Sequence, residues 1–118
     1  MNKILVVNND LDSMDLLKCW LETRQFEVAI TTNREDVPRI VREFKPGIVL
    51  ADIIQQQVIA DLKENTNSRN IPVLLMSGYT KRQDSLHLNA DDVIEKPFNL
   101  PLLELKLNKL LKQAVSVL

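Results

Sequence analysis

The chain has 118 residues, 45% of them hydrophobic, and a formal net charge of −1, which fits one domain with a substantial core. The near-neutral charge excludes the broad basic field that unspecific nucleic-acid binding needs, and the single cysteine, Cys19, excludes an internal disulfide framework. No apolar run is long enough for a membrane span or a signal peptide, so we expect one cytoplasmic domain over residues 1–118, with no nucleic-acid or membrane partner.

Short apolar runs alternate with longer amphipathic stretches along the chain. In chain order, the pattern predicts a strand at 4–7, a helix at 12–24, a strand at 26–30, a helix at 36–44, a strand at 47–51, a helix at 58–64, a strand at 71–76, a helix at 80–88, a strand at 92–95 and a helix from Asn99 to about 115. The strands are continuously apolar, which is typical of a sheet covered on both faces. Five strand-then-helix units predict an α/β domain with a parallel sheet.

Polar residues follow every predicted strand. In parallel sheets, ligands bind at the carboxyl ends of the strands, so these positions are the candidate site. They offer oxygen atoms at four strand ends and an ammonium at the fifth, which favours an anion or metal–phosphate site at one sheet edge. The residues are Asn8-Asn9-Asp10, Thr31-Thr32, Asp52, Ser77 and Lys96-Pro97.

Four segments carry a resemblance to a known family. They are KILVVNND at 3–10, PGIVLAD at 46–52, IPVLLMS at 71–77 and ADDVIEKPF at 90–98. In this order and over essentially the whole chain, they resemble the receiver domain of bacterial two-component response regulators. The resemblance implies a flavodoxin-like (βα)5 three-layer sandwich, with a five-stranded parallel sheet of order 2-1-3-4-5.

The resemblance also implies a function. Receivers take a phosphoryl group from a histidine kinase or phosphotransfer protein onto an aspartate, and Asp52 matches that position; a carboxylate is a suitable nucleophile and forms an acyl phosphate. Ser77 matches the hydroxyl that hydrogen-bonds a phosphoryl oxygen, and Lys96 matches the cation of the site. Pro97 matches the proline that usually follows a cis peptide bond. Such a domain is a phosphoacceptor rather than an ordinary enzyme.

The sequence departs from the family around this site. The acidic pair that binds magnesium is replaced by the neutral Asn8 and Asn9, so the resemblance implies only a weak Mg²⁺ site. Its ligands would be Asp52, Asn9, the backbone carbonyl of Ile54 and, through water, Asn8. We therefore expect phosphoryl acceptance to be inefficient. We expect Asp10, one position later, to point away.

Other parts of the chain also differ from the family. The loop over residues 53–57 is shorter than usual, and Val93 replaces the aromatic switch residue. Gln55 to Gln57, and Asn89, stand where receivers usually place glycines; asparagine is the residue that best tolerates a left-handed backbone after glycine. These differences leave a second function open, a phosphorylation-independent interaction module or pseudo-receiver.

The last helix has two apolar faces. At helical spacing one stripe faces the sheet, and it comprises Leu103, Leu107, Leu110, Leu111 and Ala114. Leu102 and Leu105 lie on the opposite side, beside Lys106 and Lys109. Because the family docks partners through helix four, strand five and helix five, we assign Val93, Leu102, Leu105, Lys106 and Lys109 to an interface for a second copy or another protein. A flavin or nucleotide site is disfavoured, since the turn after the first strand lacks glycines.

Overall fold

The structure, a computed structural model, describes residues 2–78 and 89–116 and contains one five-stranded parallel sheet of order β2-β1-β3-β4-β5. The expected α/β fold and strand order are therefore confirmed. The strands are β1 (Asn2–Val7), β2 (Phe26–Thr31), β3 (Ile48–Asp52), β4 (Val73–Ser77) and β5 (Asp92–Glu95).

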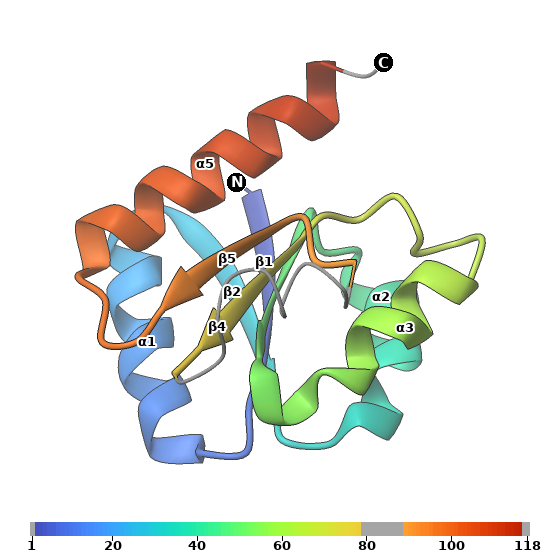
Figure 1. Cartoon of the computed structure of the whole chain (residues 1–118), viewed down its shortest axis with the longest axis horizontal. Helices are drawn as coiled ribbons and strands as arrows, with labels where there is room; N and C mark the ends of the chain where they lie inside the picture. Colours follow the sequence, from blue (N-terminus) through green and yellow to red (C-terminus); the bar gives the residue numbers. More distant parts are fainter. Residues whose placement is uncertain (1, 79–88, 117–118) are drawn as a thin grey trace.

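Helices cover both faces of the sheet and make three layers (Figure 1). One face is covered by α1 (Leu11–Thr23) and α5 (Leu100–Ser116), and the other by α2 (Val37–Phe44) and α3 (Gln57–Glu64). Two short 3-10 turns, η1 (Arg34–Asp36) and η2 (Ile53–Gln55), precede α2 and α3. The helix expected at 80–88 lies outside the described residues. None of the helices in the described part of the chain has both the length and the apolarity that a membrane crossing requires.

The continuous apolar run of β1 is explained by its position between the two helical layers. Successive side chains of a strand point to opposite faces. Ile4 and Val6 pack in the core under α1 and α5, whereas Leu5 and Val7 pack in the core under α2 and α3. All four side chains are fully buried, so neither face of the strand tolerates a polar residue.

Local sequence signals set most element boundaries. Pro38 lies in the first turn of α2, where a missing N–H costs little. Asn99 begins α5 by accepting a hydrogen bond from the Leu102 N–H at 2.7 Å. Asn89 has a left-handed backbone, with φ of 64°, as its residue type predicts. Strand β4 begins two residues later than expected, because Ile71 still belongs to a turn that bonds back to Ser68, and Pro72 has no N–H to donate.

The two faces of α5 are those that the sequence predicts. Leu103 and Leu107 are fully buried against the sheet, and Leu110 and Leu111 are nearly so. On the opposite side, Leu105 is 66% exposed. Helix α5 is therefore anchored by one stripe and presents apolar side chains to its surroundings on the other.

This asymmetry gives the first prediction. Leu107→Ala should lower the free energy of unfolding by about 2–5 kcal/mol, because it opens a cavity in a closed core. Leu105→Ala on the outer face should change it by no more than about 0.5 kcal/mol. Urea denaturation monitored by circular dichroism measures both values. Equal effects of the two substitutions would contradict the assigned orientation of α5.

Candidate functional site

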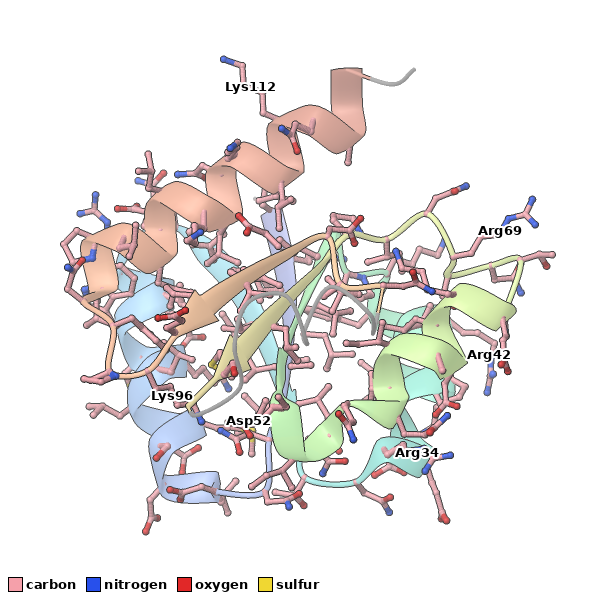
Figure 2. The ribbon with its side chains drawn as sticks, viewed as in Figure 1. Arg34, Arg42, Asp52, Arg69, Lys96 and Lys112 are labelled. Carbon is pink, nitrogen blue, oxygen red and sulfur yellow. The ribbon has the colours of Figure 1, made fainter. Side chains whose placement is uncertain are left out.

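The parallel sheet brings three chemically active residues to one edge. Asp52 is the last residue of β3, Ser77 is the last of β4, and Lys96 follows β5. Strands β3, β4 and β5 are neighbours, with Asp52 paired to Met76 and Ser77 to Glu95. The Lys96 N–H donates to the Ser77 carbonyl at 2.7 Å, which fixes the start of the loop after β5. Figure 2 shows Asp52 and Lys96 at the same end of the sheet.

Asp52 is a buried carboxylate with a partner for each oxygen. Its side chain is 2% exposed. Oδ1 accepts a hydrogen bond from the Ile54 N–H at 3.0 Å, and Oδ2 accepts one from the Lys96 ammonium. A buried carboxylate is costly unless it is paired and hydrogen-bonded, and these two donors compensate the Asp52 carboxylate at this depth. Ser77, one residue beyond the partner of Asp52 on β4, is fully buried beside it.

The loop after β1 uses its own polar side chains. The Asn8 Oδ1 accepts hydrogen bonds from the Asn9 N–H at 2.7 Å and the Asp10 N–H at 3.3 Å, which forms an Asx-turn. Asp10 caps α1 by accepting from the N–H and the hydroxyl of Ser13. The Ser13 hydroxyl holds the pKa of the Asp10 carboxyl below its ordinary value. Asp10 is thus an ionised helix cap, and it also lines the cavity beside Asp52 and Lys96.

Gln55 is a site residue that the sequence analysis did not identify. Its side-chain amide donates one hydrogen bond to the Asn9 Oδ1 and another to the Thr32 carbonyl oxygen, the latter at 3.0 Å. The side chain therefore connects the loops that follow β1, β2 and β3. The only signal in the sequence is the run of three glutamines that begins three residues after Asp52, and that run does not reveal which glutamine turns inward.

A cavity of about 700 Å³ lies beside the carboxylate. Its polar end is formed by the loop after β1 together with Asp52 and Lys96, and its walls include Met14, Leu17, Phe98 and Leu100. Leu16 and Ile54 also line it, and they are 76% and 68% exposed. The site is therefore open on a largely apolar surface that a partner can cover.

The residues assigned to the interface on β5 and α5 are not equally accessible. Val93 is 5% exposed and packs in the core under α2 and α3, so its side chain contributes no surface there, because alternation along β5 points it inward. Leu102 and Leu105 are exposed, as is Lys109, whereas the Lys106 ammonium pairs with Asp92 at 3.2 Å. The Lys96–Pro97 peptide bond is cis, as the resemblance implies.

Comparison with known protein families identifies the chain. The profile of the family described as "Response regulator receiver domain" matches residues 4–108, which is most of the sequence, so the chain belongs to the response regulator receiver family. It is a phosphoacceptor domain of two-component phosphorelay signalling.

Two curated relatives illustrate the match. The transcriptional regulatory protein CpxR homolog of Haemophilus influenzae is 30% identical over 122 aligned positions, which cover 98% of this chain and 53% of that protein. The response regulator GtcR of Aneurinibacillus migulanus is 28% identical over 101 positions, covering 81% of this chain and 42% of that protein. The chain thus spans about half the length of the curated relatives that it matches.

Solved structures agree on the fold. The signal receiver domain of a signal transduction histidine kinase from Syntrophus aciditrophicus has a TM-score of 0.86 at 25% identity, covering 96% of this chain and 92% of that chain. The BeF3-activated N-terminal receiver domain of Klebsiella pneumoniae RstA has a TM-score of 0.82 at 23% identity, covering 93% and 98%. At 23% identity, the similarity to RstA shows the fold alone.

Receiver domains typically bind Mg²⁺, and the residues at this edge do not fit that ion as they are arranged. Within residues 2–78 and 89–116, no three His, Cys, Asp or Glu side chains gather closely enough to hold a metal ion. Asp52 is paired with Lys96, and the side-chain oxygens of Asn8 and Asn9 accept hydrogen bonds from within the protein. Mg²⁺ needs carboxylate anchors and oxygen ligands that are free to turn toward it.

The ion pair gives the second prediction. Lys96→Met should lower the free energy of unfolding at pH 7 by about 1–3 kcal/mol, because it leaves a buried carboxylate without its cation. The same substitution in an Asp52→Asn background should have a much smaller effect, since no charge then needs compensation. Urea denaturation measures all four combinations, with Lys109→Met as an exposed control expected within about 0.5 kcal/mol of wild type. Additive effects of the two substitutions would contradict the pairing.

Proposed function

We propose that this domain accepts a phosphoryl group on Asp52 from a phosphohistidine of a histidine kinase or phosphotransfer protein, and that it does so inefficiently. The observation that carries the proposal is the buried Asp52 carboxylate, held between the Ile54 N–H and the Lys96 ammonium and next to Ser77. Family membership supports the same assignment.

The transfer needs three roles from this chain. An oxygen of Asp52 attacks phosphorus, and the new P–O bond forms as the P–N bond of the donor breaks; the bonding electrons stay on that nitrogen, and the imidazole, protonated on its other nitrogen, leaves as a neutral ring. Lys96 moves from the carboxylate to a phosphoryl oxygen and balances its charge. Ser77 donates its hydroxyl to another phosphoryl oxygen. The apolar rim, with Leu16 and Ile54, receives the donor protein.

Inefficiency follows from the residues after β1. In the proposed assignment, Asn8 and Asn9 stand where the family has its acidic pair, so they contribute amide oxygens without charge. Any Mg²⁺ binding through Asp52, Asn9, the Ile54 carbonyl and, through water, Asn8 would be weak, because the side-chain oxygens would first have to give up their present hydrogen-bond donors. Lys96 therefore has to compensate most of the negative charge of the transferred phosphoryl group.

The third prediction tests this function by intact-protein mass spectrometry after incubation with acetyl phosphate. Wild type should gain a single phosphoryl group slowly and to a small extent, and Asp52→Asn should gain none. The double substitution Asn8→Asp with Asn9→Asp should gain it faster and in a Mg²⁺-dependent way, because two carboxylates restore metal anchors. An adduct that persists in Asp52→Asn would contradict the assigned acceptor.

A second candidate function is a phosphorylation-independent interaction module. The observation that favours it is the outer face of α5, where Leu102 and Leu105 are exposed, combined with amide oxygens after β1 that are already hydrogen-bonded. If mass spectrometry finds no phosphoryl adduct in wild type but finds one after the double substitution Asn8→Asp with Asn9→Asp, the result would favour the interaction module over phosphoryl acceptance.

The fourth prediction concerns self-association through that face. If a second copy docks there, the weight-average mass in sedimentation equilibrium should rise with protein concentration, and Leu105→Glu should return it to the monomer value. Gln57→Glu adds the same charge at an exposed position on the opposite layer and serves as the control. A monomer at all concentrations, unchanged by Leu105→Glu, would remove the self-association version of this function.

A further inference from the structure

The Gln55 side chain joins the loops after β1 and β2 to the turn after β3, in addition to the backbone hydrogen bond from the Asn8 N–H to the Thr31 carbonyl at 3.2 Å. The amide nitrogen of glutamine carries two hydrogens and can donate twice. One hydrogen bond goes to the Asn9 Oδ1 in the loop after β1, and the other to the Thr32 carbonyl in the loop after β2. Gln55 itself ends the turn η2 that begins after Asp52. Three loops therefore meet at one nitrogen atom.

The two oxygen atoms that accept hydrogen bonds from this nitrogen are also of the kind that coordinate metal ions. A side-chain amide oxygen and a backbone carbonyl oxygen, converging from two different loops, are suitable ligands for a hard divalent cation. Here both oxygens point at a neutral N–H donor from the third loop.

The side-chain oxygens of Asn8, Asp10 and Asp52 also have hydrogen-bond or ion-pair partners within the protein. The Asn8 Oδ1 accepts two backbone N–H groups, and the Asp10 carboxylate caps α1. Asp52 is balanced by Lys96, one negative charge against one positive charge. A divalent cation brought into this arrangement would add two positive charges and would have to displace existing donors from the side-chain oxygens of Asn8, Asn9 and Asp52.

We infer that the Gln55 amide takes the structural place of the cation in this domain, and ties the loops after β1, β2 and β3 together without metal. The inference rests on the proposed function in assigning Asn8 and Asn9 to the metal-binding positions of the family. It does not need Asp52 to be phosphorylated. Gln55 is thus a positioning residue that keeps the site assembled at any magnesium concentration.

The test compares three substitutions by amide hydrogen exchange at neutral pH, in metal-free buffer and with excess MgCl2. Without metal, Gln55→Ala should speed exchange of residues 8–10 and 32–33 by about fivefold, since two hydrogen bonds are lost. Gln56→Ala, at the exposed neighbouring position, should leave these rates as in wild type. Wild type should show the same rates with and without Mg²⁺.

The decisive variant is Gln55→Glu. It keeps the shape of the side chain but replaces two donors by a carboxylate, which faces two oxygen atoms. Exchange over residues 8–10 and 32–33 should therefore be as fast as in Gln55→Ala in metal-free buffer, and Mg²⁺ should restore protection to near the wild-type level, because a carboxylate now converges with two oxygens on one point. A purely structural role of the side chain would not produce rescue by a cation.

Three results would overturn the inference. They are wild-type exchange rates in Gln55→Ala, equal rates for Gln55→Glu with and without Mg²⁺, and a strong effect of Mg²⁺ on wild type. No phosphodonor is present in any of these measurements. A failure here therefore leaves the mass-spectrometric test of Asp52 unaffected, and the reverse also holds.

Discussion

The parallel direction of all five strands is the constraint on which the site depends. It places the carboxyl ends of β1, β2, β3, β4 and β5 at one edge, so residues far apart in the sequence meet there. Asp52 and Lys96 are 44 positions apart in the sequence. They form an ion pair because their strands, β3 and β5, run in the same direction on either side of β4 and end at the same edge. The helices contribute by burying both faces of the sheet, which removes water from beneath the carboxylate.

Charge balance accounts for how the rest of the edge is composed. A buried carboxylate requires a positive charge or strong donors nearby. Asp52 obtains one charge from Lys96 and one backbone donor from Ile54, which is sufficient for a single carboxylate. Additional carboxylates at positions 8 and 9 would need a further cation. Since both positions are asparagine, the edge is balanced with one lysine, and hydrogen bonds between neutral groups can hold the loops.

Those features that follow from local patterns were predictable from the sequence. Continuous apolarity located β1 and β3, helical spacing separated Leu107 from Leu105 on α5, and the polar residues after each strand located the edge. The predicted start of β4 was wrong by two residues, because apolarity at Ile71 does not report the turn that holds it.

The side-chain network around the edge was not predictable in the same way. Gln55 reaches Asn9 across 46 positions, and three consecutive glutamines offer no pattern that distinguishes the first from the others. The assignment of Val93 to an interface came from the resemblance to the family, whereas adjacent apolar residues at Val93 and Ile94 fit a strand that is buried on both faces, as observed. Tertiary hydrogen bonds between side chains depend on the assembled sheet.

The two halves of the edge would respond differently to a phosphoryl group on Asp52. The Gln55 hydrogen bonds join neutral groups on the β1, β2 and β3 side, and this side contacts the acceptor through the Ile54 N–H, which donates to Asp52 from the same turn. Lys96 would have to exchange its carboxylate partner for a phosphoryl oxygen, and its backbone is bonded to Ser77 at the end of β4. A response would therefore be transmitted along β4 and β5, where Asp92 pairs with Lys106 of α5, one residue from the exposed Leu105. The lysine-linked side, whose ammonium can exchange one anionic partner for another, is therefore the side that connects the acceptor to α5.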